Sequence, residues 1–391
     1  MQCKNVSNKF PFPRAYLSFL LLFASSIVFA IDEPNDTEAP KISKFKSPDD
    51  GKFDLSAFLD QANGFVPVVI PITEPAVGVG GVLALVFVDK KGQGEAIGRP
   101  DISTVAGLRT DNGTKGAFLA DSRYWRAGRI QTLAALFDAD VNLRFYGEGG
   151  SLQGDDPRTY TLATRGGLVQ AKFRLSESKN WFGVGYLLAD TQASFKLFPN
   201  FPDFPEIENK TRSSGLTLAY THDTRNNVFT PTQGNYIDVS GVLFSELLGS
   251  DENFQRASIT GLHYRPLSEQ WNLGLLGSAS FSFGDAPFYL IPAISMRGVP
   301  AMSYQGRQVA QVEAELSWQF KPRYSMVIFA GTGRAQNLFE NFGKVREATA
   351  GGLGFRYLIA KKYGMNMGID AAYGPDGMAY YVQFGSAWMR P

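Results

Sequence analysis

Residues 270–284 read QWNLGLLGSASFSFG, and their side chains alternate between two kinds of surroundings along the whole stretch. One set is apolar or small and consists of Trp271, Leu273, Leu275, Gly277, Ala279, Phe281 and Phe283. The other set is mostly polar or small and consists of Asn272, Gly274, Leu276, Ser278, Ser280 and Ser282. A period of two residues predicts a β-strand whose two faces meet different environments.

The same alternation recurs in four further runs. Their apolar sets are Ala310, Val312, Ala314, Leu316, Trp318 and Phe320; Met365, Met367, Ile369 and Tyr373; Met378, Tyr380, Val382, Phe384 and Trp388; and Leu133, Phe137, Val141, Leu143 and Phe145. Strands of soluble sandwiches average about 5–6 residues, whereas a tilted transmembrane strand needs about 9–11 to cross the lipid. These runs reach the longer length. We therefore predict an all-β transmembrane barrel with apolar faces toward lipid and polar faces toward a wet lumen, rather than a soluble sandwich.

About sixteen such runs occupy the chain after residue 63. They lie near 64–71, 77–89, 100–110, 114–124, 130–147, 159–176, 180–197, 213–223, 234–247, 252–266, 270–283, 306–320, 323–335, 344–360, 364–374 and 377–388. The antiparallel barrel must close, because an open sheet edge in lipid leaves backbone groups unpaired. An even number places both barrel ends on the periplasmic side, with short turns such as 321–322 and 375–376 there. The longer connections 148–158, 198–212 and 284–305 then face outward.

The first thirty residues predict export. Lys4, Lys9 and Arg14 precede an apolar run, and small residues flank a cleavage point after Ala30, so residues 1–30 are a predicted signal peptide. A retained helical anchor is the alternative. Residues 31–62 are polar and predict a periplasmic leader of low order with one helical turn near Leu55–Leu59, followed by the barrel at 63–391. Together these features predict the cell outer membrane as the location.

Composition argues against several other functions. The net charge of +1 is unlike that of nucleic-acid binders. The single cysteine, Cys3, lies in the predicted signal peptide, so no disulfide or thiolate metal site is expected. No cofactor is expected either, and no cluster has metal-ligand spacing. An outer-membrane hydrolase would have to use His222 or His263, and neither sits beside a suitable nucleophile in the strand pattern. We predict no enzymatic activity.

The connection 284–305 contains one of five motifs that together resemble those of a known protein family. It contains Met296, Arg297, Gly298 and Val299, and the strand that follows bears Glu313 and Glu315. Four other stretches accompany it: 223–234 (DTRNNVFTPTQG), 351–357 (GGLGFRY), 370–374 (DAAYG) and 381–385 (YVQFG). In this order they resemble the BamA/TamA superfamily of bacterial surface-antigen barrels, over roughly residues 64–388.

The resemblance implies that an extracellular loop folds back into the lumen with Arg297 and Gly298 at its tip. By the alternation, Glu313 and Glu315 point inward, where a carboxylate can form a charge-assisted pair with Arg297. Glycine at 298 would permit a tight return of the backbone. Arg356 and Asp370 also face inward and form a second predicted pair. Charges that merely line a wet channel remain the alternative for both sets.

Two other groups of residues follow from the resemblance. Asp223, Arg225, Pro231 and Gly234 match the family's turn motif. Tyr381, Phe384 and Trp388 belong to the closing strand that serves as its assembly signal. The chain also departs from the pattern, because Val299 replaces a usual phenylalanine and residues 327–334 lack an aspartate, so that the loop anchor would rest on the glutamates alone. The leader is too short for a periplasmic POTRA domain.

Two functions remain open at this point. The barrel could help insert or export polypeptides or lipids through a weak seam between its first and last strands. It could instead be a small channel or structural surface protein whose lumen is plugged by the loop. Expected partners are outer-membrane lipid and lipopolysaccharide, the outer-membrane assembly machinery during biogenesis, and a polypeptide or lipid client, with no nucleic acid.

Overall fold

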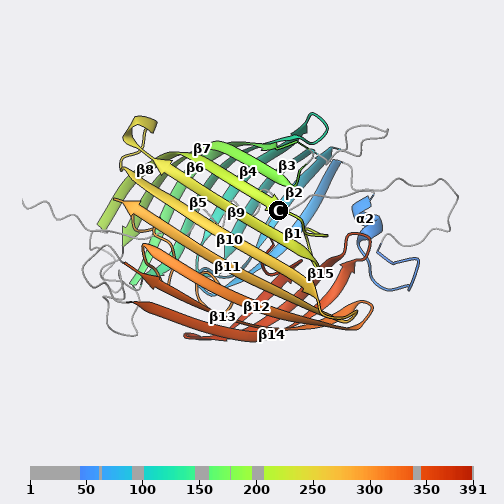
Figure 1. Ribbon diagram of the computed structural model, residues 1–391. Helices are drawn as coiled ribbons and strands as arrows, with labels where there is room; N and C mark the ends of the chain where they lie inside the picture. Colours follow the sequence, from blue (N-terminus) through green and yellow to red (C-terminus); the bar gives the residue numbers. More distant parts are fainter. Residues whose placement is uncertain are drawn as a thin grey trace, which may run out of the picture.

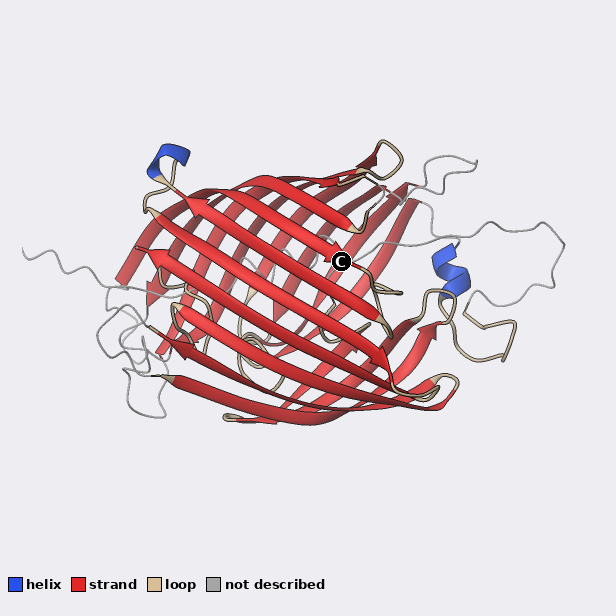
Figure 2. Ribbon diagram, in the orientation of Figure 1, coloured by secondary structure: helices blue, strands red, loops and turns tan. Residues whose placement is uncertain are grey.

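The computed structural model describes residues 45–60, 64–89, 101–145, 158–176, 178–195, 207–337 and 345–389. Nearly all of this chain is β-strand (Figure 2). The predicted signal peptide and the first part of the leader lie outside the described residues. Within the described residues, no helix is long and apolar enough to cross a membrane.

Sixteen strands follow one another along the described chain, beside a short helix α2 (Ser56–Asp60) and a 3-10 turn η2 (Glu246–Leu248). The strands are β1 (Gly64–Glu74), β2 (Gly78–Asp89), β3 (Asp101–Thr110), β4 (Lys115–Trp125), β5 (Ile130–Phe145), β6 (Arg158–Arg174), β7 (Asn180–Phe195), β8 (Ile207–Asp223), β9 (Gly234–Phe244), β10 (Phe254–Pro266), β11 (Trp271–Gly284), β12 (Gln308–Lys321), β13 (Tyr324–Gln336), β14 (Arg346–Ala360), β15 (Met365–Gly374) and β16 (Gly377–Phe384).

Each strand pairs antiparallel with its sequence neighbour, in the order β1 to β16. The sheet curls into a barrel that brings β16 back beside β1 (Figure 1). The predicted transmembrane barrel of about sixteen strands is thus confirmed. Odd-numbered strands run away from the end that carries α2, which we call the periplasmic end, and toward the outer end. The turn at 375–376 follows an odd-numbered strand and lies at the outer end, so its predicted periplasmic position was wrong.

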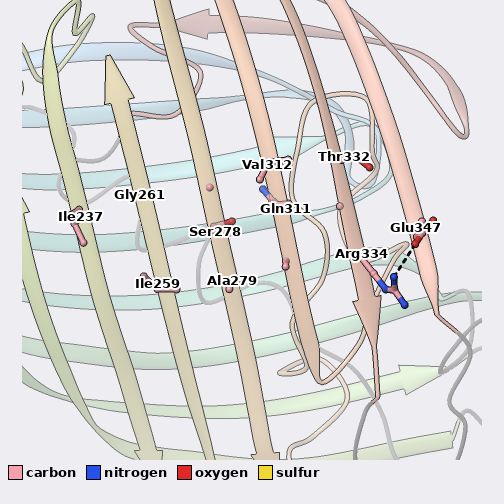
Figure 3. A pocket seen from close by; sticks show the side chains of 13 residues that line it. Ile237, Ile259, Gly261, Ser278, Ala279, Gln311, Val312, Thr332, Arg334 and Glu347 are labelled. Atoms are coloured by element: carbon pink, nitrogen blue, oxygen red, sulfur yellow. Dashed lines mark ion pairs between the residues drawn. The ribbon is translucent and has the colours of Figure 1, made fainter. Parts of the chain in front are cut away.

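The outer wall shows the lipid-facing chemistry that the alternation predicts. Val69, Val312 and Ile369 are each more than half exposed although they are apolar, as expected for side chains whose solvent is lipid. Between β9 and β14 the wall is hollowed by about 780 Å³ where small residues such as Gly261 and Gly277 alternate with larger ones (Figure 3). The hollow opens outward and, among the described residues that line it, offers no converging set of buried polar groups.

Aromatic rings gather on the wall near the periplasmic end of β11 to β14. Trp271 stacks on Trp318 with ring centroids 5.7 Å apart, and Trp318 contacts Phe320 at 5.6 Å. Tyr324 continues the series 6.3 Å from Phe320. Such a girdle marks the boundary between hydrocarbon and headgroups. The lipid boundary at this end therefore lies close to the strand ends.

The two faces of β5 are the reverse of the prediction, and the outer halves of β5 to β8 carry charges on their outward side. Leu133, Phe137, Val141 and Leu143 were expected on the lipid face, but all four point into the barrel, where the last three are buried and Leu133 packs against the same core. Their neighbour Asp138 points outward and stands in register with Arg165, the first step of a ladder of opposite charges across four strands: Asp138, Arg165, Asp190 and Arg212. A charged outer face with an apolar inner face is the pattern of a barrel in water. These strand halves therefore project beyond the lipid.

The position of the lipid boundary on β7 can be tested by labelling. Leu188 and Gln192 share the outward face of β7, below and above the charge ladder. We expect Gln192→Cys to react with a membrane-impermeant maleimide on intact cells, and Leu188→Cys to stay unlabelled in its lipid surroundings. Equal labelling of both cysteines would contradict a boundary between them. The absence of other cysteines from the predicted mature chain keeps the background low.

Candidate functional site

The connection between β11 and β12 folds into the lumen instead of extending outward. Its first part packs into the apolar core of the outer halves, where Phe288 lies 5.4 Å from Tyr160 and 5.5 Å from Phe195, ring centroid to centroid. Phe288 is fully buried, and the side chains from Tyr289 to Ile291 are at most 6% exposed. The upper lumen is therefore filled by side chains, contrary to the expectation of a wet interior along the full height of the barrel.

Arg297 lies further along this connection and reaches two acidic side chains. Its Nη2 is 2.8 Å from Glu315 Oε2 on β12, and its Nη1 is 2.8 Å from Asp370 Oδ2 on β15. The guanidinium also lies over the ring of Phe329, 3.6 Å from the centroid, a favourable cation–π geometry. Glu313, the other predicted partner, is buried in the same wall of the lumen.

Asp370 also binds the second arginine. Arg356 on β14 donates from Nη2 to Asp370 Oδ2 at 3.0 Å and from Nη1 to Asp370 Oδ1. Asp370 is completely buried, so one carboxylate is shared by two guanidinium groups. The expectation that the loop anchor rests on the glutamates alone was wrong. The two predicted sets of charges form one network, because β12, β14 and β15 line the same side of the lumen.

Gly298 occupies a position that only glycine fits well. Its φ is +86°, a left-handed conformation that costs little without a side chain. A Cβ there would lie 2.9 Å from the Cβ of Ala350. The backbone N–H of Gly298 donates to the hydroxyl of Tyr381 at 3.0 Å. Gly298 thus seats the loop against β14 and β16.

The loop touches both edge strands of the barrel within four residues. Gly298 binds Tyr381 of β16, and the N–H of Ala301 donates to Glu74 Oε1 of β1 at 3.2 Å. Between the strands themselves, the described residues show a 3.3 Å hydrogen bond from the N–H of Val382 to Thr73 Oγ1. Among the described residues the sheet order contains no backbone ladder between β1 and β16. We call this junction the seam.

Trp388 lies in a different place from the one predicted. The closing strand β16 ends at Phe384, and Gly385 with φ +72° turns the chain inward. Trp388 is then buried inside the barrel, with its ring centroid 6.3 Å from that of Tyr264. Its indole packs closely over Gly274, where an added Cβ would lie 2.9 Å from it. Its assignment to the closing strand was wrong. The glycine after Phe384 is the one sequence signal for this turn.

The predicted turn motif builds the periplasmic turn between β8 and β9. Asp223 accepts two hydrogen bonds from the guanidinium of Arg225, at 2.9 and 2.8 Å, and Arg225 lies over the ring of Tyr236. Gly234 has φ +107° where β9 begins, and Pro231 is buried in the turn. The turn also meets the segment after β16, because the N–H of Ser386 donates to the carbonyl oxygen of Phe229 at 2.6 Å.

A polar cavity of about 470 Å³ lies at the periplasmic end, beneath the charge network. Glu315 and Arg356 border it, together with Ser386 from the segment after β16. The two histidines lie elsewhere, and each Nδ1 contacts an asparagine oxygen, at 2.6 Å for His222 and 2.7 Å for His263. Within the described residues no group of acidic, histidine or cysteine side chains could hold a metal ion.

Known proteins share this architecture. Residues 106–296 match the Omp85 superfamily domain. The fold is similar to BamA from Haemophilus ducreyi lacking POTRA domains 1–3, with TM-score 0.56, 14% identity, and coverage of 87% of this chain and 79% of that one. It is also similar to CdiB from Escherichia coli (TM-score 0.55, 14% identity, 81% and 61% coverage) and from Acinetobacter baumannii (0.53, 13%, 83% and 59%).

No curated protein sequence matches the chain. This chain covers about three fifths of either CdiB chain, and its described residues contain no POTRA domain. The family resemblance inferred from the motifs is nevertheless confirmed by the domain match and by the shared barrel. Residues 106–296 are similar to the Omp85 superfamily domain, and the chain is a sixteen-stranded outer-membrane β-barrel of the kind found in BamA and CdiB.

Proposed function

We propose that the barrel assists the insertion or export of polypeptides at the outer membrane, through opening of the seam between β1 and β16. The observation that carries this proposal is the weak junction itself. Every other neighbouring pair of strands is joined by a backbone ladder. Among the described residues, β1 and β16 are joined instead by the hydrogen bond from Val382 to Thr73 and by the loop tip, which binds both strands from inside. Members of the superfamily are assembly and secretion proteins.

The register at the seam supports the same proposal. Val382 lies two residues before the end of β16, yet it contacts Thr73 near the outer end of β1. Antiparallel neighbours run past each other residue by residue, so β1 continues toward Gly64 well beyond the end of β16. The periplasmic part of β1 therefore has an edge with no strand beside it in the described structure. Such an edge is a template for pairing with an extended polypeptide.

Two prolines reduce the number of hydrogen bonds that this edge can donate. Pro67 and Pro71 pair in register with Leu85 and Gly81 of β2. In an antiparallel pair, alternate residues turn both backbone groups toward the partner and the others turn both away. Proline has no N–H, so these two residues take the positions turned away from β2. The seam edge of β1 thus keeps its carbonyl acceptors but lacks two donors, which favours transient rather than permanent pairing.

The loop tip would act as the lock on the seam. Arg297 fastens the tip to β12 and β15, and the neighbouring backbone groups bind β16 and β1 from inside. Release of the tip would remove contacts on both sides of the seam at once. The closing strand with Tyr381 and Phe384 would also serve as the signal read by the outer-membrane assembly machinery. Lipid and lipopolysaccharide would cover the apolar outer wall.

Depletion of the protein, followed by quantitative proteomics of the outer membrane, tests this function. We expect a subset of outer-membrane or secreted proteins to fall severalfold while their transcripts stay constant, because their insertion fails. Unchanged levels of all of them would contradict the proposal. That result would favour the second function, a structural or channel protein plugged by the loop, for which the filled upper lumen is the supporting observation. Bilayer conductance that rises in an Arg297→Ala variant would then support a channel.

A further inference from the structure

The described part of the leader, residues 45–60, docks on the periplasmic rim of the barrel beside β13 and β14. Arg323, in the turn before β13, is almost completely buried beneath it. Its Nη1 donates to Asp54 Oδ2 at 2.8 Å and to the carbonyl oxygen of Phe53 at 3.3 Å, and its Nη2 donates to Asp50 Oδ1 at 2.9 Å. The leader was expected to be of low order, and this part of it is instead held by a buried arginine.

Backbone contacts extend the docking along the end of β14. The N–H of Leu55 donates to the carbonyl oxygen of Ile359, near the end of β14, at 2.7 Å. The hydroxyl of Tyr357 donates to the carbonyl oxygen of Phe53 at 2.7 Å, and the N–H of Lys361 donates to Asp54 Oδ2 at 3.2 Å. Helix α2 follows directly and ends at Asp60.

The position of this dock relative to the seam follows from connectivity. β1 begins at Gly64, four residues after Asp60, and four residues of extended chain reach at most about 14 Å. In the circular order of the barrel, β14 and β1 are separated by β15, β16 and the seam. The leader is thus fixed on one side of the seam and runs into the edge strand on the other side.

We propose that residues 45–60 form a clasp that limits the separation of β1 from β16 at the periplasmic end of the barrel. The inference rests on the proposed function in taking the seam as the part that opens. When β1 moves away from β16, the short link pulls on α2, and the clasp must detach from Arg323 before the periplasmic end can widen. A partner that displaces the clasp would release the seam.

The ion pairs suit a clasp that persists at ordinary pH. The hydrogen bond from Arg323 holds the pKa of Asp50 down at about 2, below its usual value of 3.8. A depressed carboxyl pKa stabilises docking above the value of the free group, and this stabilisation is lost only as pH falls toward about 2. Release by a partner rather than by mild acid is therefore expected.

The test measures the seam in the full-length barrel in lipid nanodiscs. Spin labels at Val69→Cys and Tyr380→Cys, both on the lipid face of the edge strands, report the β1–β16 distance. We expect Arg323→Gln to add a population longer by about one strand spacing, roughly 5 Å. Arg334→Gln is the matched control, because its ion pair with Glu347 is exposed, lies at the outer end of β13 away from the leader, and such pairs contribute little.

A second variant protects the test against misfolding. Asp50→Asn with Asp54→Asn breaks the same contacts from the leader side and leaves the barrel sequence intact, and limited proteolysis of residues 45–60 reports whether the clasp has detached. A detached clasp with an unchanged distance distribution would overturn the inference. Widening of the seam without any change in client insertion would support the clasp inference and contradict the proposed function.

Discussion

Replacement of Asp370 by alanine is expected to release the loop from the lumen and to lower the stability of the barrel. The carboxylate is fully buried and satisfies two arginines, Arg297 from the loop and Arg356 from β14. Removal of one partner from a buried ion pair typically costs about 3–5 kcal/mol, because an uncompensated charge remains. Here two guanidinium groups would lose a partner. Protease cleavage within residues 285–307 of the purified barrel should rise severalfold.

The comparison with other variants makes this experiment specific. Glu313→Ala with Glu315→Ala should loosen the loop less, because Asp370 still holds Arg297. Asp376→Ala, in the exposed turn before β16, is a control that should leave cleavage unchanged. Heat-modifiable gel mobility shows whether each barrel remains folded. A folded Asp370→Ala barrel with wild-type cleavage would show that the network does not hold the loop.

Much of the architecture follows from sequence periodicity alone. Strict alternation, as in residues 270–284, requires strands with unlike faces, and lipid allows only a closed sheet. The strand number and most strand positions could be predicted on this basis. The motif predicted an inward position for Arg297, and the alternation of the next strand predicted Glu315 as its acidic partner. These inferences succeed because they depend on local patterns or on one adjacent strand.

Other features depend on contacts that a single strand does not encode. The sharing of Asp370 joins a loop residue to a strand more than seventy residues away, and only closure of the barrel sets that distance. Alternation also has no direction: Val141 inside with Asp138 outside gives the same period as the reverse. The two faces of β5 were therefore interchanged in the prediction, because the strand leaves the lipid midway and its inner face belongs to the same buried core as Phe288.

Trp388 was misplaced for a related reason. Its parity matches the apolar face of β16, but Gly385 interrupts the extended backbone before the pattern can continue. The docked part of the leader was hidden as well, because a polar segment shows no period and its order comes from one buried arginine on the barrel rim. Polar segments acquire structure from their partners, and composition alone does not reveal those partners.

The seam is the centre of the functional account, and a reversible disulfide across it gives the largest expected effect on function. Thr73 and Val382 are in direct contact across the seam, and the predicted mature chain has no other cysteine to interfere. Oxidation of a Thr73→Cys, Val382→Cys variant would join β1 covalently to β16. The pair Thr73→Cys, Val79→Cys joins β1 to β2, which are already paired in register there, and is the matched control.

The decisive measurement is the rate at which outer-membrane or secreted clients, identified by depletion, mature in cells that carry these variants. Under oxidising conditions the Thr73–Val382 disulfide should slow maturation to the rate seen on depletion, and added reductant should restore it. The control disulfide should have no effect in either condition. Client maturation at the wild-type rate with the β1–β16 disulfide fully formed would contradict a role for the seam.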